Sequence, residues 1–210
     1  MTRGRFITVE GLEAAGKSTH TGYLAELLRD GGIDPVVTRE PGGTAFAEQV
    51  RQLVLDCKNA GIDPLAESLL MFAARRQHLK DTIEPALSEG TWVRCERVTD
   101  ATVAYQRGAP AVPETTLGRL VELVHPQLQP DLTIYLDVPV AVSLRRTRAR
   151  GEELDRIETE GAKFFDRVRT TYLRMGRELP RFRLVDSDRP SKDVRRDLNG
   201  IMRELLESAR

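Results

Sequence analysis

The 210-residue sequence lacks several features that would each indicate a class of protein. The sequence contains 32 Lys and Arg residues in total and 32 Asp and Glu residues in total. It therefore lacks the excess of basic residues on which generic nucleic-acid binding depends. No apolar run approaches the roughly 20 residues of a membrane span. The N-terminal segment MTRGRFITVEG contains no signal-peptide hydrophobic core. We therefore expect a protein that binds neither nucleic acid nor membranes.

Cysteine and histidine are also scarce. The two cysteines, Cys57 and Cys95, lie far apart and form no C-x-x-C motif. This usage is typical of reduced thiols in a cytoplasmic protein. The three histidines, His20, His78 and His125, show no metal-ligand spacing. The sequence thus predicts a cytoplasmic protein without a disulfide framework or a histidine metal site.

The hydrophobic pattern alternates short apolar strands with amphipathic helices and contains no repeat or linker. It predicts one domain over residues 1–210, an α/β three-layer fold with a five-stranded parallel sheet flanked by helices. Strands are expected at residues 5–10, 35–38, 91–95, 132–137 and 181–186. Helices are expected at residues 17–30, 44–57, 64–88, 139–149, 159–178 and 190–208. Ligands of such sheets bind at the carboxyl ends of the strands.

The segment GLEAAGKST (11–19) matches G-x-x-x-x-G-K-[ST], the spacing of a phosphate-binding P-loop. It follows an apolar strand and opens a helix, a context in which backbone N–H groups bind phosphate oxygens. Lys17 is expected to reach the β- and γ-phosphates of ATP, and the Ser18 hydroxyl is expected to bind Mg²⁺. The predicted ATP-binding residues are Gly11, Leu12, Glu13, Ala14, Ala15, Gly16, Lys17, Ser18 and Thr19.

Other motifs narrow the class of P-loop protein. Guanine-specific switches carry Asn-Lys-x-Asp, and neither Asn59 nor Asn199 is followed by lysine. A large motor ATPase would need a longer chain, so a small nucleotide kinase is favoured. Such a kinase needs arginines around the acceptor phosphate, because a guanidinium stays charged and binds oxyanions in bidentate fashion. The candidates are Arg39, Arg75, Arg76 and Arg97.

Several further segments resemble bacterial thymidylate kinase. They are TREPGGT (38–44), MFAARRQHL (71–79), PALSEGTWV (85–93), AYQ (104–106), PDLTIYLDV (130–138) and LDRIE (154–158). The resemblance implies the P-loop nucleoside monophosphate kinase fold and transfer of the ATP γ-phosphoryl group to dTMP with Mg²⁺, giving dTDP for dTTP synthesis. It also implies a homodimer.

The resemblance assigns roles by position in the sequence. Glu13 would act near the acceptor and, with Ser18, bind the metal, and Glu96-Arg97 would stand at the catalytic Asp-Arg pair of the family. Phe72, or Met71 if the register shifts by one, would stack on thymine. The expected substrate-binding residues are Arg39, Pro41, Phe72, Arg75, Arg97, Thr102, Tyr105 and Gln106. A bulky Tyr105 could also exclude a ribose 2′-hydroxyl by size.

The segment RRTRARGEELDRIE (145–158) corresponds to the mobile lid of the family. The resemblance implies a short basic lid whose Arg150 and Arg156 neutralise the transferring phosphoryl group. The charge pattern alone also fits a solvated helix face, on which Glu152, Glu153 and Asp155 balance the arginines.

Three departures from the family pattern keep other functions open. Glu96 is one methylene longer than the usual aspartate, the stretch 107–113 contains two prolines, and Glu152-Glu153 replaces a single acidic residue. One alternative is a kinase for another (deoxy)nucleoside monophosphate. The other is a degenerate relative that binds nucleotides without turnover.

Overall fold

The computed structural model describes residues 3–108 and 112–209. In this part of the chain, five strands form a parallel sheet in the order β2-β3-β1-β4-β5. The strands are β1 (Phe6–Gly11), β2 (Val36–Arg39), β3 (Val93–Glu96), β4 (Leu132–Asp137) and β5 (Phe182–Asp186). The central strand β1 is buried along its whole length, as its sequence FITVEG favours for a sheet covered on both faces. This confirms the predicted α/β class and the five-stranded parallel sheet.

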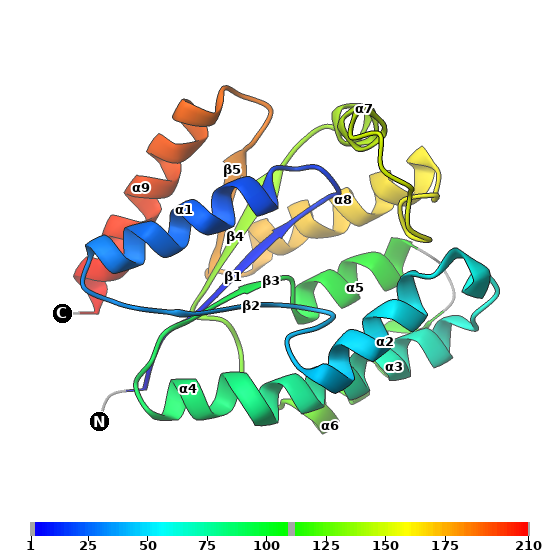
Figure 1. The fold of residues 1–210 in the computed structure, drawn as a ribbon, viewed down its shortest axis with the longest axis horizontal. Helices are drawn as coiled ribbons and strands as arrows, with labels where there is room; N and C mark the ends of the chain where they lie inside the picture. The colour runs from blue at the N-terminus through cyan, green and yellow to red at the C-terminus, as the bar shows by residue number, and fades with distance from the viewer. Residues whose placement is uncertain (1–2, 109–111, 210) are drawn as a thin grey trace.

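Helices cover the two faces of the sheet (Figure 1). On one face, α1 (Lys17–Asp30) packs against α9 (Ser191–Ser208). On the other face, α5 (Thr99–Gly108) packs against α8 (Ala162–Glu178), and α3 (Pro64–His78) packs against α2 (Ala45–Leu55) and α6 (Glu114–Val124). The remaining helices are α4 (Glu84–Ser88) and α7 (Val140–Ala149), with a 3₁₀ turn at Cys57–Asn59. Among the described residues, no helix combines the length and apolar character needed to cross a membrane.

Two parts of the helical pattern differ from the prediction. The helix expected at 64–88 is interrupted by a π-helical segment, Leu79–Ile83, whose two end residues stay buried against β1 and β3. Helices α5 and α6 lie where the sequence analysis predicts none, although Leu117, Leu120, Val121 and Val124 of α6 follow the helical period and could have indicated that helix. Residues 109–111 of the proline-containing stretch 107–113 lie outside the described residues.

The register brings the strand ends to one edge of the sheet. Gly11 at the end of β1 lies opposite Leu136 of β4, and Arg39 at the end of β2 lies opposite Glu96 of β3. The P-loop, the segment after β2 and the segment after β3 therefore meet at this edge. Parallel sheets bind their ligands at such an edge.

Candidate active site

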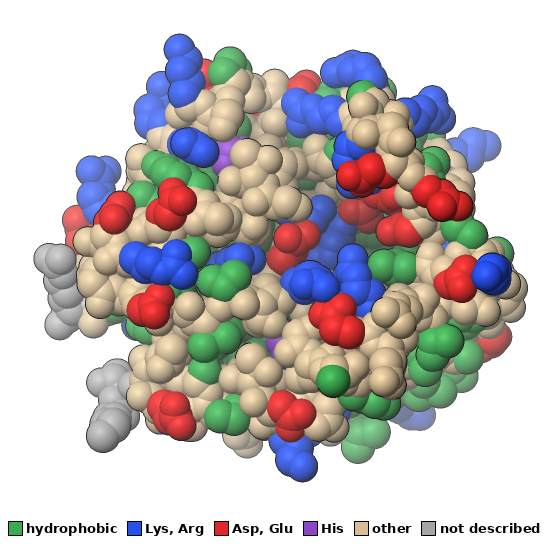
Figure 2. Space-filling model, in the orientation of Figure 1, with side chains coloured by type: hydrophobic (Ala, Val, Ile, Leu, Met, Phe, Trp, Pro, Cys, Tyr) green, Lys and Arg blue, Asp and Glu red, His purple; other side chains and the backbone are tan. Residues whose placement is uncertain are grey.

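A cleft of ≈ 570 Å³ opens at this edge, between the P-loop, α2, α3, α5 and the lid. Figure 2 shows acidic and basic side chains gathered around a hollow on this face of the molecule. Most of the predicted site residues line the cleft. They are Glu13, Ala14, Gly16, Lys17, Ser18, Thr19, Arg39, Pro41, Arg75, Glu96, Arg97, Thr102, Tyr105, Gln106 and Arg150. Gly11, Leu12 and Ala15 lie behind this surface and are buried.

The P-loop is held by contacts that its own motif does not reveal. The Lys17 Nζ atom donates hydrogen bonds to Leu12 O at 2.7 Å and Gly11 O at 3.2 Å, and its side chain is only 6% exposed. From outside the loop, Ser143 of α7 donates to Glu13 O and Ser187 donates to Ala15 O, both at 2.7 Å. Burial, together with the nearby Arg97 charge, lowers the pKa of Lys17 to about 8. The loop thus presents a lysine whose position is set before any phosphate binds.

Glu13 connects the P-loop to the elements across the cleft. Its carboxylate forms an ion pair with Arg97 and accepts a hydrogen bond from Tyr105 Oη at 2.9 Å. Burial opposes ionisation of Glu13, but the Arg97 and Lys17 charges outweigh it, so the pKa of Glu13 is lowered. Arg97 has a left-handed backbone, with φ 60°, and its guanidinium lies 4.9 Å above the Tyr105 ring. These contacts bring Glu13, Arg97 and Tyr105 together at the cleft.

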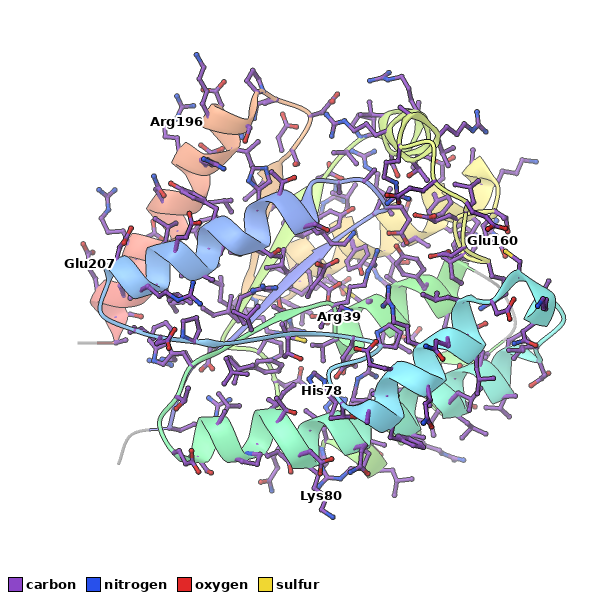
Figure 3. All side chains as sticks on the ribbon, viewed as in Figure 1. Arg39, His78, Lys80, Glu160, Arg196 and Glu207 are labelled. Atoms are coloured by element: carbon purple, nitrogen blue, oxygen red, sulfur yellow. The ribbon has the colours of Figure 1, made fainter. Side chains whose placement is uncertain are left out.

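Arg75 lines the cleft and is 1% exposed. Its Nε donates to Glu40 at 2.7 Å and its Nη2 donates to Thr102 Oγ1 at 2.8 Å. Glu40 also contacts His78, which projects from α3 toward the end of β2, where it meets Thr38 (Figure 3). The remaining Arg75 nitrogen, Nη1, is buried and has no hydrogen-bond partner among the described residues. A buried guanidinium N–H without a partner is well suited to an oxyanion ligand.

The two alternatives for the stacking residue are placed differently. Met71 lines the cleft, whereas Phe72 is 2% exposed and is not part of the cleft wall. The Phe72 ring is parallel to His125, with centroids 6.5 Å apart, and the Arg75 guanidinium lies 4.9 Å from its centre. Phe72 therefore supports the wall from behind, and the thioether of Met71 faces the cleft. The register shifted by one residue is the one that this geometry favours.

The other acceptor arginines have distinct environments. Arg39 lines the cleft and donates from Nη2 to both carboxylate oxygens of Glu48, at 3.0 and 2.9 Å. Arg76 pairs with Glu84 and is not part of the cleft wall. Arg51 also lines the cleft and donates to Pro41 O at 3.0 Å. The sequence prediction missed Arg51, because it lies inside an amphipathic helix and carries no motif.

The two lid arginines, Arg150 and Arg156, also differ in whether they line the cleft. Arg150 lines the cleft and pairs with Glu158. Arg156 is not part of the cleft wall: it pairs with Glu67 of α3, and its Nε donates to Val54 O at 2.8 Å. The prediction that both arginines face the phosphoryl group fits the position of Arg150. For Arg156 the structure shows an attachment of the lid to α2 and α3 instead.

The predicted metal-binding residues Ser18 and Glu13 both line the cleft, next to Lys17. The described residues include no group of three or more His, Cys, Asp or Glu side chains arranged to hold a metal ion. Glu96 also faces the cleft, and its carboxylate makes no hydrogen bond or ion pair with the described residues.

Comparison with known proteins decides the family. Residues 9–198 match the family model of thymidylate kinase. This chain belongs to the thymidylate kinase family. It is 48% identical over 208 residues to a thymidylate kinase of Pseudomonas savastanoi, with 99% of both chains covered. It is also 48% identical over 206 residues to that of Nitrosomonas europaea, which covers 98% of this chain and 95% of the relative.

A solved structure agrees. The crystal structure of the thymidylate kinase from Ehrlichia chaffeensis superposes with a TM-score of 0.74 at 30% identity, covering 96% of this chain and 99% of the other. The resemblance noted in the sequence and the P-loop kinase fold are therefore confirmed.

Proposed function

We propose that this protein transfers the γ-phosphoryl group of ATP to dTMP, giving dTDP for dTTP synthesis. The observation that carries the proposal is the arrangement of two phosphate-binding sets across one cleft. Lys17 and the P-loop form one side, and the unpartnered Nη1 of Arg75 lies on the other. Phosphoryl transfer depends mainly on positioning the two substrates and stabilising charge, and this arrangement supports both.

On the donor side, the P-loop N–H groups and Lys17 would hold the ATP phosphates. Mg²⁺ is typically bound by substrate phosphates and one or two protein oxygens, and it neutralises charge on those phosphates. We place the Ser18 hydroxyl as its protein ligand. Because Glu13 already accepts hydrogen bonds from Tyr105 and Arg97, Glu13 would act as a nearby negative charge and not as a direct ligand.

On the acceptor side, Arg75 and Arg39 would bind the dTMP phosphate, and Met71 would contact the flat face of the thymine ring. Tyr105 stands beside Glu13 at the deep end of the cleft, where a ribose 2′-hydroxyl would meet its ring. Arg97 and Arg150 would stabilise charge on the transferring group.

The test is an assay of ADP release with dTMP, dUMP, dCMP, UMP and dGMP measured side by side. We expect dTMP to have the highest kcat/KM and dUMP to fall below it by about tenfold to two-hundredfold, the worth of one methyl group. Lys17→Met should abolish turnover without loss of the native circular dichroism spectrum. Equal kcat/KM for dTMP and dCMP would contradict the pocket assignment, and turnover by Lys17→Met would contradict the kinase.

We also propose a cytoplasmic homodimer. Phe46 and Leu53 of α2 and Leu65 and Leu69 of α3 are exposed large apolar residues on two helices that pack side by side (Figure 1). Apolar side chains grouped in this way are typical of a protein–protein interface. Sedimentation should give a dimer for the wild type and a monomer for Leu69→Glu; a wild type that sediments as a monomer at micromolar concentration would refute the dimer.

A further inference from the structure

The carboxylate of Glu67 lies where three elements of the cleft meet. Glu67 is in the first turn of α3, and its side chain is 14% exposed. Its Oε1 accepts a hydrogen bond from Gln106 Nε2 of α5 at 3.1 Å. Its Oε2 forms the ion pair with Arg156 of the lid. One carboxylate therefore bonds at the same time to α5 and to the lid.

The lid is attached at the same place by its backbone. Arg156 N donates to Leu55 O at 3.0 Å, and Arg156 Nε donates to Val54 O at 2.8 Å. Both acceptors are carbonyls at the C-terminal end of α2, which the helix itself leaves without partners. The Cys57 thiol, in the 3₁₀ turn that follows α2, donates to Leu154 O of the lid at 3.4 Å. Arg156 is thus fixed on α2 and α3 by main-chain and side-chain contacts together.

Helices α3 and α5 are joined twice along their length. The deeper contact is Arg75 to Thr102, and the contact at the mouth is Glu67 to Gln106. Met71 lies one helical turn from Glu67 and one from Arg75, on the side of α3 that lines the cleft. Met71 therefore lies between these two contacts, and a change at Glu67 would act on the spacing of α3 and α5 beside it.

We infer that Glu67 is a positioning residue that anchors both the lid and the α5 wall of the acceptor pocket. The inference rests on the proposed kinase function, because it assigns the lid to ATP and the α5 wall to dTMP. When Arg156 holds Glu67, the lid is docked with Arg150 at the cleft, and Gln106 is held against α3. Loss of the contact between Glu67 and Arg156 loosens the lid, which then keeps only its bonds to α2, whereas loss of the Gln106 contact loosens the acceptor wall.

Kinetics of four variants separate these contacts. Glu67→Gln keeps an oxygen for Gln106 but removes the charge that holds Arg156, so kcat should fall about tenfold while the KM for dTMP changes less than about threefold. Arg156→Ala should lower kcat at least as much, because it also removes the bond to Val54 O, and the double variant should lose no more than Arg156→Ala alone. Gln106→Ala should raise the KM for dTMP and leave kcat within about threefold.

The matched control is Glu84→Gln. Glu84 lies outside the cleft wall and pairs with Arg76 on the exposed side of the helix, so this substitution also removes one charge and one ion pair. It should leave both kinetic constants unchanged. Losses that multiply in the Glu67→Gln, Arg156→Ala double variant would overturn the coupling.

A second measurement does not depend on turnover. Hydrogen exchange followed by mass spectrometry should show faster exchange over residues 150–158 in Glu67→Gln and Arg156→Ala, by about tenfold, and no change in Glu84→Gln. Unchanged lid exchange in Glu67→Gln would overturn the inference. If the wild type does not phosphorylate dTMP, the proposed function fails, and the exchange result still decides whether Glu67 holds the lid.

Discussion

Glu10 is a buried carboxyl group at the end of β1, directly before the P-loop, and it gives the fold a measurable dependence on pH. Its side chain is fully buried, accepts a hydrogen bond from Val98 N at 3.0 Å and is contacted by Tyr172 Oη at 2.8 Å. Burial, reinforced by the Asp100 charge, raises the pKa of Glu10 to about 8. At neutral pH the folded protein therefore keeps a proton on Glu10.

The sign of the effect follows from proton binding. In the unfolded chain Glu10 has its ordinary pKa of 4.5, so between pH 4.5 and about 8 unfolding releases its proton. Raising the pH in this window therefore favours the unfolded state, and the stability that is present below pH 4.5 is lost as the pH rises to about 8. The slope is at most about 1.4 kcal/mol per pH unit, or about 4 kcal/mol from pH 5 to pH 8.

Glu10→Gln isolates the contribution of the Glu10 proton to the pH dependence of stability, because glutamine reproduces the neutral side chain and cannot lose a proton between pH 4.5 and about 8. We expect urea unfolding at pH 5, 6.5 and 8 to show the variant gaining stability over the wild type as the pH rises. Glu84→Gln, which changes an exposed carboxylate, should follow the wild-type curve. Parallel curves for wild type and Glu10→Gln would refute the buried neutral carboxyl.

Two further predictions concern the cleft. Glu96→Gln should lower kcat at least about tenfold, because this carboxylate lies at the end of β3 and interacts electrostatically with Lys17. Glu96→Asp should also have a lower kcat than the wild type, because near-attack geometry is sensitive at the ångström scale. An unchanged kcat in Glu96→Gln would remove Glu96 from the mechanism. Met71→Ala should raise the KM for dTMP about tenfold and leave kcat within about threefold, since it removes a wall and no charge; the opposite pattern would show that the side chain does not contact the base.

The donor half of the site could be predicted from the sequence because its parts are contiguous. Residues 11–19 carry the loop, the lysine and the hydroxyl, and the flanking strand and helix confirm their context. The anchors of the loop could not be predicted in this way. Ser143 and Ser187 reach the P-loop carbonyls from elements more than 120 residues further along the chain, and serine has no signature for such a contact.

The acceptor half depends on how helices turn relative to one another. Met71 and Phe72 are adjacent apolar residues, and periodicity cannot say which of them faces the cleft. The packing of Phe72 against His125 decides it, and His125 follows α6, a helix that the sequence does not predict. For the same reason Arg156 looks like any other lid arginine until its partner is known. That partner, Glu67, lies 89 positions away.

The arginines of the cleft and the lid fall into two groups by the exposure of their own side chains. Arg39 and Arg150 are 51% and 39% exposed in their pairs with Glu48 and Glu158, whereas Arg97 and Arg156 are 14% and 11% exposed in theirs. A phosphate oxyanion needs the same donors as a carboxylate and must compete with it. Glu48, the partner of Arg39, is 39% exposed, so this pair contributes little and exchanges easily. Glu158, Glu13 and Glu67 are 10%, 17% and 14% exposed, and a buried carboxylate left alone costs several kcal/mol.

The difference in exposure implies different roles for these arginines. Arg39 could turn from Glu48 to a phosphate at little cost. Arg150 is itself exposed, but the same turn would leave the buried Glu158 with the Asp155 N–H as its remaining partner. Arg97 and Arg156 keep their partners Glu13 and Glu67 and hold the frame of the site. Arg75 differs from both groups, because its partners Glu40 and Thr102 leave Nη1 free among the described residues. A phosphate bound at Nη1 would therefore displace no carboxylate, whereas a phosphate bound by Arg39 would have to replace Glu48.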